Sequence, residues 1–181
     1  LTGWGESVAE GTPFYSYETV TTAWHILQDF LIPSILGKNI YDIDSAITSY
    51  EKVRGHMMAK AGLEAALWDL FAKSKNISLS KMMGGTRNKI DVGVSIGIQS
   101  SVPDLIKKIE GYLAEGYKRI KIKIAPRNDI QFVKAVRKEF PDILFQVDAN
   151  SAYELKHIDL FKQMDDLNLL LIEQPLGYED I

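Results

Sequence analysis

The stretch KRIKIKI, residues 118–124, decides the fold of this chain. Isoleucine alternates with a charged residue along it, and this period of two is typical of a β-strand, whose side chains point to opposite faces in turn. We expect the apolar face to contact helices and the charged face to lie on the other side of the sheet. The two faces carry Ile120, Ile122 and Ile124, and Arg119, Lys121 and Lys123.

Three more segments have the same strand-like character: DVGVSIG from residue 91, ILFQVDAN from 143 and LLLIEQP from 169. Together with KRIKIKI they recur about every 26 residues, which is the length of a strand–helix repeat. Between them lie stretches in which apolar residues recur at helical spacing. This alternation predicts a run of βαβ units, and therefore an α/β fold with a parallel sheet.

The first half of the chain has a different pattern. Its opening, LTGWGES, is typical of a strand that ends in a turn, and GGTRNK at 84–89 interrupts the helical pattern that follows. We therefore predict a mostly helical α+β domain over residues 1–88 and a second domain of βα units over residues 89–181. Helical periodicity covers three stretches of the first domain, at residues 18–31, 43–53 and 57–74.

The composition is that of an ordinary globular protein, with 46% hydrophobic and 25% charged residues and a formal net charge of −3. Basic residues are spread along the chain, which argues against a nucleic-acid surface. No apolar run approaches the roughly 20 residues that span a bilayer. The lack of cysteine excludes thiolate metal sites and thiol nucleophiles. We expect a cytoplasmic protein that binds neither nucleic acid nor membrane. The three tryptophans are interpreted as packing residues.

Two acidic residues come at the ends of consecutive predicted strands. The period of two places Asp148 and Glu173 on the face that carries Lys123. These three positions are 25 residues apart in turn, so they should be equivalent positions on neighbouring strands. The carboxyl ends of parallel strands are where α/β barrels build their active sites. We therefore expect the three side chains to converge.

A lysine beside two carboxylates has two interpretations. Carboxylate oxygens suit Mg²⁺, which takes about six ligands, so a third acidic residue from a following strand would be needed to complete a metal site. The alternative is a metal-free network in which Lys123, Asp148 and Glu173 pair with one another. The face that carries the lysines also has two interpretations. It either lines the interior of a barrel or is solvated on a half-exposed strand.

Several longer motifs occur in one order and spacing: MAKAGLEAALWDLFAK, VGVSIG, YKRIKIKIAPRNDIQFVKAVRKEFP, QVDANSAY and LIEQPLG. Together they resemble the muconate-cycloisomerase branch of the enolase superfamily, and within it the o-succinylbenzoate synthase / N-succinylamino acid racemase group. The resemblance runs from residue 3 to the end of the chain. It implies an enolase-like fold in which residues 1–88 are a capping domain, incomplete at its N-terminus. Residues 89–181 would be the first half, about four βα units, of a modified (β/α) barrel.

The resemblance also implies roles for individual residues. Lys123 would be the acid/base that meets the proton next to a substrate carboxylate, and Lys121 would stabilise the enolate-like intermediate. Asp148 and Glu173 would be the first two ligands of Mg²⁺ (or Mn²⁺). The remaining matches are polar residues near the metal and the substrate, Asn150 and Ser95, and a lid over the substrate, residues 7–17.

The implied reaction is dehydration of a small-molecule carboxylate to o-succinylbenzoate in menaquinone biosynthesis, with racemisation of N-succinylamino acids as a second activity. Another cycloisomerase or epimerase of the superfamily is an alternative, and so is a catalytically silent fragment. The third acidic ligand and a second catalytic lysine, which the family places further along, are not among these 181 residues. We expect these residues to be inactive alone. A homo-oligomer that supplies the missing groups is left open.

Overall fold

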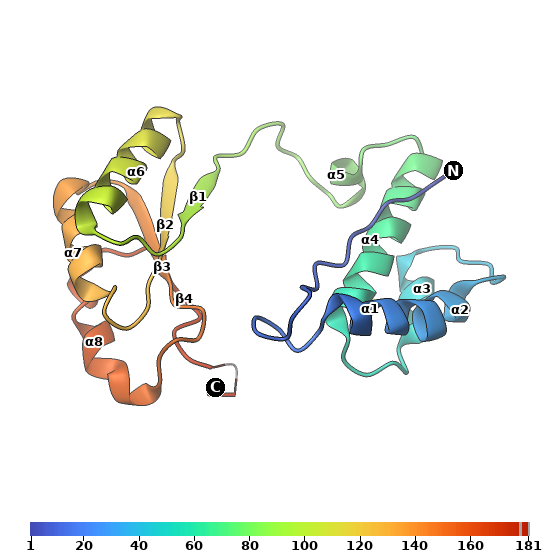
Figure 1. Cartoon of the computed structure of the whole chain (residues 1–181). Coiled ribbons are helices and arrows are strands. Elements are labelled where there is room, and N and C mark those ends of the chain that lie inside the picture. The colour runs from blue at the N-terminus through green and yellow to red at the C-terminus, as the bar shows by residue number, and fades with distance from the viewer. Residues whose placement is uncertain (178, 181) are drawn as a thin grey trace. The chain divides into compact units, whose positions relative to one another are not determined.

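The computed structural model describes residues 1–177, 179 and 180 and divides the chain into two compact units, Leu1–Arg87 and Asn88–Ile181 (Figure 1). Each unit has its own hydrophobic core. In the described part of the chain, no helix has the length and apolar character needed to cross a bilayer.

The first unit is built mainly from helices. The first of these, α1 (Val20–Ile26), begins after Thr19, whose side chain accepts a hydrogen bond from the N–H of Thr22. A π-helical turn carries it into α2, where Pro33 has no N–H to offer to a regular ladder, and this accounts for the wider turn. The other elements of the unit are η1 (Leu27–Leu31), α2 (Ile32–Ile35), α3 (Ile43–Tyr50), α4 (Met57–Ser74) and α5 (Leu79–Met82).

The start of α4 is capped by a carboxylate from far along the chain. Glu18 is only 2% exposed and accepts hydrogen bonds from the N–H groups of Met58, at 2.8 Å, and Ala59, at 3.1 Å. The first N–H groups of a helix have no partner within it, and the helix dipole favours negative charge at this end. Glu18 therefore fastens the segment before α1 to α4.

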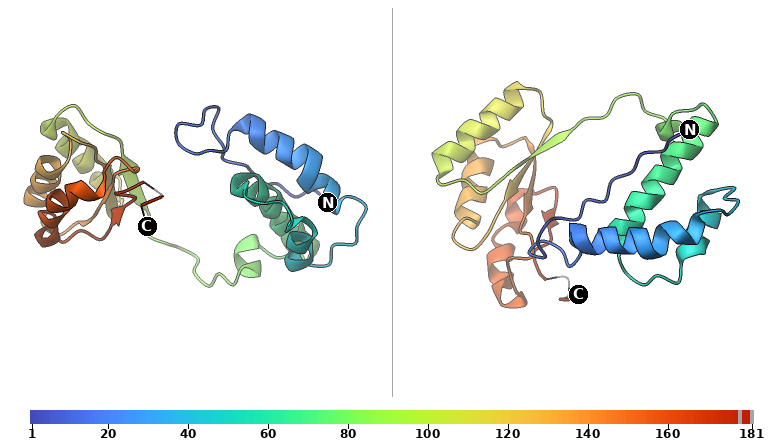
Figure 2. Two further views of the ribbon diagram at one scale, coloured as in Figure 1. Left: turned by 90° about the horizontal axis from the view of Figure 1, so that it is seen from below. Right: turned by 45° about the vertical axis from the view of Figure 1, so that its right-hand side comes forward.

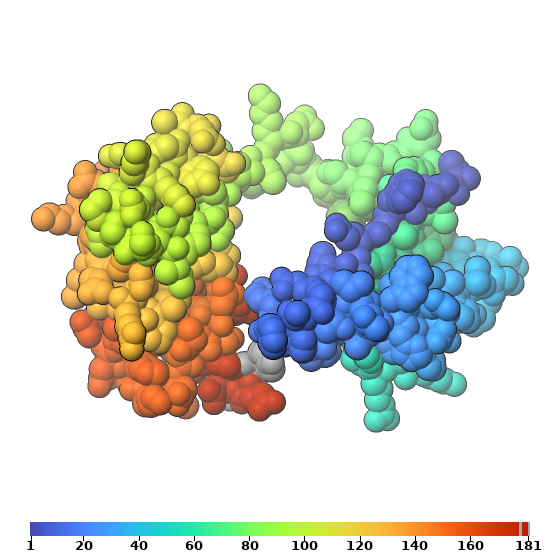
Figure 3. Space-filling view, viewed as in Figure 1, coloured from blue at the N-terminus to red at the C-terminus, as the bar shows by residue number. Residues whose placement is uncertain are grey.

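The strand predicted for LTGWGES is wrong as a sheet element. This segment is extended, but it lies against α4 and pairs with no strand among the described residues (Figure 3). Its glycines allow the close approach: a Cβ at Gly3 would lie 2.0 Å from the carbonyl oxygen of Ala66, and one at Gly5 would lie 2.1 Å from that of Gly62. Contact with the helix, rather than strand pairing, holds this segment.

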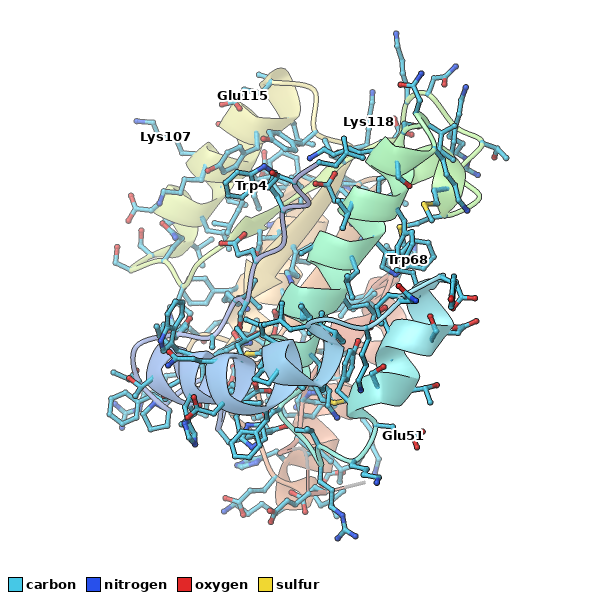
Figure 4. The ribbon with its side chains drawn as sticks, turned by 90° about the vertical axis from the view of Figure 1, so that its right-hand side faces the viewer. Trp4, Glu51, Trp68, Lys107, Glu115 and Lys118 are labelled. Atoms are coloured by element: carbon cyan, nitrogen blue, oxygen red, sulfur yellow. The ribbon has the colours of Figure 1, made fainter. Side chains whose placement is uncertain are left out.

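The interpretation of all three tryptophans as packing residues is also wrong. Trp4 and Trp24 are 75% and 68% exposed, because no described residues cover their sides of the unit. Trp68 does pack, against the small core of Ile43 and Leu67, and its indole N–H donates to Glu64. Figure 4 labels Trp4 on the extended segment and Trp68 on α4.

The second unit contains the predicted parallel sheet. Four strands pair in sequence order, all parallel, and helices lie along the sheet in the views of Figures 1 and 2. The α/β fold expected from the 26-residue repeat is therefore confirmed. The elements are β1 (Gly93–Ile96), α6 (Val102–Ala114), β2 (Arg119–Lys123), α7 (Ile130–Glu139), β3 (Leu144–Asp148), η2 (Leu155–His157), α8 (Ile158–Lys162), η3 (Asp165–Leu167) and β4 (Ile172–Glu173).

The isoleucine face of β2 forms the centre of this unit. Ile120, Ile122 and Ile124 are between 0% and 2% exposed and belong to one core cluster with residues of α6 and α7. Full burial of one such side chain contributes about 1.5–3 kcal/mol. The expected division of KRIKIKI into a helix-facing side and a polar side is confirmed.

The fourth strand is shorter than the predicted LLLIEQP and includes only Ile172–Glu173. Asn168, just before the LLLIEQP stretch, has a left-handed backbone with φ of 47°. Leu170 and Leu171 still bond to β3, through Phe145 C=O at 2.7 Å and Val147 N–H at 3.3 Å, but outside a regular ladder. The apolar run predicted a strand, and the turn at Asn168 delays its start.

Arg137 joins α7 to the segments that precede β3 and β4 through hydrogen bonds to backbone carbonyl groups. Its guanidinium also lies over the ring of Phe145, with 5.6 Å between Cζ and the ring centroid. Arginine suits this place because its planar group carries five donors. The acceptors of Arg137 are the carbonyl oxygens of Phe140, Pro141, Ile143, Leu167 and Asn168.

We predict that Arg137→Lys destabilises the protein by about 2–3 kcal/mol, because lysine keeps the charge but cannot reach these carbonyl groups together. Urea unfolding followed by circular dichroism measures the free energy of unfolding. Lys138→Ala, an exposed change on the same helix, is the control and should alter stability little. A lysine variant as stable as the wild type would contradict this account of Arg137.

Candidate functional site

The strands β2, β3 and β4 bring the predicted polar residues to one edge of the sheet. In the observed register Lys123 pairs with Asp148, and Asp148 pairs with Glu173. The predicted equivalence of these three positions is confirmed. Two residues before Lys123 on the same face of β2, Lys121 pairs with Ser95 of β1. Neighbouring strands lie about 5 Å apart, so side chains in one such row are in reach of each other.

The lysines and acids contact each other directly. Lys121 Nζ lies 3.1 Å from Asp148 Oδ2 and 3.0 Å from Glu173 Oε2. Lys123 Nζ lies 2.5 Å from Asp148 Oδ2 and also donates to the side-chain oxygen of Asn150. Five of the six predicted site residues thus share one network. Ser95 lies in the neighbouring row, and its residue is exposed.

Asp148 is the most buried member of the network, at 1% exposure. Burial alone raises the pKa of its carboxyl group, but hydrogen bonds from Lys123, from the N–H of Asn150 and from Lys121 outweigh burial and hold the pKa below its ordinary value. The carboxylate therefore stays ionised.

The pKa of Lys121 shifts in the opposite direction from the one that burial favours. Burial lowers the pKa, but hydrogen bonds and charges from Glu173 and Asp148 raise it by more, so the net pKa is above the ordinary value. Lys121 stays an ammonium group.

The donor set fits part of a divalent-metal site. Asp148 and Glu173 both direct an oxygen at the Lys121 ammonium, so the two carboxylates converge on a position that already holds positive charge. Hard carboxylate oxygens are the ligands that Mg²⁺ and Mn²⁺ prefer. Two carboxylates are fewer than such an ion needs, and the described residues contain no group of three potential metal ligands.

The predicted lid, residues 7–17, belongs to the first unit. It has no helix or strand, apart from an isolated bridge between Glu10 and Thr19, and it carries highly exposed aromatic side chains. These are Phe14, Tyr15 and Tyr17.

Sequence reasoning gave no role to two glutamines near this edge. Gln146 is 6% exposed, and its Oε1 has no hydrogen-bond partner among the described residues. The strand alternation already placed it on the polar face. Gln174 accepts a hydrogen bond from Asn150 at 3.4 Å and has a left-handed backbone, with φ of 43°. Only its position directly after Glu173 could have indicated it.

Comparison with known proteins finds a family model that matches each half of the chain. The family model "Mandelate racemase / muconate lactonizing enzyme, N-terminal domain" matches residues 1–84, and the model "Enolase C-terminal domain-like" matches residues 104–181. The chain is 49% identical to an o-succinylbenzoate synthase of Geobacillus stearothermophilus and 44% identical to an N-succinylamino acid racemase of Thermus thermophilus, over 181 residues in both cases. It covers 48% and 49% of those two proteins.

The solved structures agree. A member of the enolase superfamily from Listeria innocua is 43% identical, with a TM-score of 0.93, and the match covers 97% of this chain and 47% of that one. A muconate lactonizing enzyme from Pseudomonas putida is 26% identical, with a TM-score of 0.84, over 97% of this chain and 50% of that one. The chain therefore spans about half the length of the curated relatives and solved structures that it matches.

We predict that Asp148 makes the stability of the metal-free protein depend on acid pH. Its pKa is lower in the folded protein than the ordinary 3.8, so its contribution is full above about pH 5 and is lost as the pH falls through 3.8 toward the folded-state pKa. Asp148→Asn should therefore be destabilising at neutral pH, and its difference from the wild type should shrink below about pH 4.

Urea unfolding at several pH values, in a metal chelator, measures this difference. Glu139→Gln, on the exposed side of α7, is the control for removal of a carboxylate outside the network. A difference between Asp148→Asn and wild type that stays constant from pH 7 to 3 would show that ion pairing of Asp148 does not contribute to stability.

Proposed function

The chain belongs to the enolase superfamily, and on this premise we propose that the protein containing it is a magnesium-dependent o-succinylbenzoate synthase of menaquinone biosynthesis. The observation that carries the proposal is the row Lys123–Asp148–Glu173 at the carboxyl ends of three neighbouring parallel strands. This row presents a potential base next to two anionic metal ligands, which is what proton removal beside a carboxylate requires.

Lys123 is the group that we assign to proton transfer. Its Nζ is held by Asp148 and by the side-chain oxygen of Asn150, so its position is set from two sides. In the proposed reaction the uncharged amine accepts the proton on the carbon next to the substrate carboxylate. A guanidinium could not do this, because arginine stays protonated in proteins.

Lys121 is suited to a different task. It is an ammonium group between Asp148 and Glu173, and these carboxylates stabilise its charge. We assign it to stabilising the negative charge that develops on the substrate as the proton leaves. A charge that is already in place contributes more to the rate than one that must be brought there.

Asp148 and Glu173 are the residues that would hold the Mg²⁺ (or Mn²⁺) ion. When bound, the ion supplies positive charge next to the substrate carboxylate. Its other ligands would be water, substrate oxygens and groups outside these residues, because two carboxylates satisfy only part of its coordination.

Racemisation of N-succinylamino acids is the second candidate activity. It is supported by the relatives of that name from Thermus thermophilus and Amycolatopsis, which are 44% and 42% identical to this chain. Both reactions begin with removal of a proton next to a carboxylate, so the row at β2–β4 serves either. Assays of the complete protein with both substrates decide between them.

We predict that Lys123→Ala in the complete protein lowers kcat for both reactions by at least about 100-fold, because the base is lost. Steady-state rates with each substrate measure this. Lys118→Ala, an exposed residue just before β2 (labelled in Figure 4), should keep wild-type rates. Wild-type turnover in Lys123→Ala would refute the assignment of the base.

We also predict that Asp148→Asn and Glu173→Gln each weaken Mg²⁺ binding by at least about tenfold, because each loses one anionic ligand. Calorimetric titration of the complete protein with Mg²⁺ measures the affinity without using activity. Glu154→Gln, on an exposed turn after β3, is the matched control. Unchanged affinity in both site variants would place the metal elsewhere.

A further inference from the structure

Hydrogen bonds connect the four loops that follow β1, β2, β3 and β4. Asn128, in the loop after β2, donates from its side chain to the carbonyl oxygen of Gln99 after β1, at 3.0 Å. Tyr153, after β3, lies 3.4 Å through its hydroxyl from Asp129 Oδ2 and donates its N–H to Pro175 C=O, after β4, at 3.1 Å. These contacts run along the edge of the sheet that carries the candidate site.

Tyr153 bonds to the loops on both of its sides. The residue is 3% exposed, and its ring packs edge-on against Phe161, with centroids 5.0 Å apart, and against His157, at 5.5 Å. Burial, together with the charge of Asp129, raises the pKa of the Tyr153 hydroxyl well above its ordinary value. The hydroxyl therefore keeps its proton and acts as a donor to Asp129.

Asp129 has two separate functions in this arrangement. Its Oδ1 accepts from the N–H of Ile130 at 2.8 Å and so caps the first turn of α7. Its Oδ2 faces Tyr153. The start of α7 is thereby tied to the loop that follows β3, the strand next to β2.

The loop between β3 and Tyr153 has an unfavourable backbone. Asn150 and Ser151 both have positive φ angles, 42° and 63°. Such conformations are unfavourable for residues other than glycine and persist only where the surroundings hold them. Ser151 N–H bonds to Gln174 C=O at 2.7 Å, and Tyr153 fixes the next part of the loop.

This loop matters because Asn150 contacts two site residues. Its side-chain oxygen accepts from Lys123, and its N–H donates to Asp148 Oδ1 at 3.0 Å. A shift of residues 149–153 would move both partners. The position of Lys123 therefore depends on what holds the loop.

We propose that Tyr153, through its hydrogen bonds to Asp129 and Pro175, is a positioning residue that holds Asn150 against Lys123 and Asp148. The catalytic part of this inference rests on the proposed function, whereas the loop-holding part does not. A tyrosine that only fills the core would act through its ring, so removal of its hydroxyl would leave the loop and the site unchanged.

Three substitutions in the complete protein separate these roles. Tyr153→Phe removes only the hydroxyl. Asp129→Ser keeps a residue that caps α7 but is too short to reach Tyr153. Asp129→Asn keeps the cap through its amide oxygen and keeps a hydrogen bond to Tyr153, whose hydroxyl oxygen then accepts from the amide N–H. If the Tyr153–Asp129 contact is what matters, the first two variants share one defect, the double variant Tyr153→Phe/Asp129→Ser is no worse than either, and Asp129→Asn resembles the wild type.

The first readout is amide hydrogen exchange of residues 149–153, measured without substrate. We expect it to be at least about fivefold faster in Tyr153→Phe and Asp129→Ser and unchanged in Asp129→Asn, because an opened loop exposes these N–H groups. Wild-type exchange in Tyr153→Phe, or equal acceleration in Asp129→Asn, would overturn the proposal. A wild-type protein with neither activity would refute the proposed function and leave this readout valid.

The second readout is the division of the kinetic effect. We expect kcat to fall roughly tenfold in Tyr153→Phe and Asp129→Ser with KM changed by less than about twofold, because the base is misplaced while binding groups remain. Asp129→Asn should keep the kcat of the wild type. A lowered melting temperature with unchanged kcat would assign Tyr153 a structural role only and would overturn the catalytic part.

Discussion

The burial of the Asp148 carboxylate is the constraint on which this edge of the molecule depends. A charge removed from water must be paired and hydrogen-bonded, because an isolated buried carboxylate is very costly. Two lysines on the neighbouring strand and the N–H of Asn150 meet this need. The alternation of lysine and isoleucine in β2 follows from it, since both cations must reach the same face.

The two ends of the strands have different tasks. At the carboxyl ends, left-handed residues such as Asn150 and Gln174 reduce stability. Near the other end, Arg137 satisfies carbonyl groups before β3 and β4, and the isoleucine face of β2 buries apolar area. Stability is thus supplied away from the site, as parallel α/β folds commonly arrange it.

Much of the second unit could be predicted because its pattern is local and repeated. A period of two within KRIKIKI and a spacing of 25 residues between Lys123, Asp148 and Glu173 together determine which side chains meet. The late start of β4, the course of LTGWGES and the exposure of Trp4 were missed, because each depends on which segment comes to lie beside it. The contact of Tyr153 with Asp129 was missed for the same reason, since it joins two loops with no shared pattern.

The two lysines illustrate how similar residues on one strand acquire different chemistry. Lys121 contacts two carboxylates, whereas Lys123 contacts one carboxylate and a neutral amide. Each additional negative neighbour favours the ammonium form, so Lys121 is suited to remain charged. Lys123 stands at the outer end of the strand and is the lysine that the loop after β3 touches. Because Asn150 is neutral, the loop can orient Lys123 without adding the negative charge that would bind its proton more tightly. A residue that must give and take a proton is therefore better oriented by an amide than by a second carboxylate.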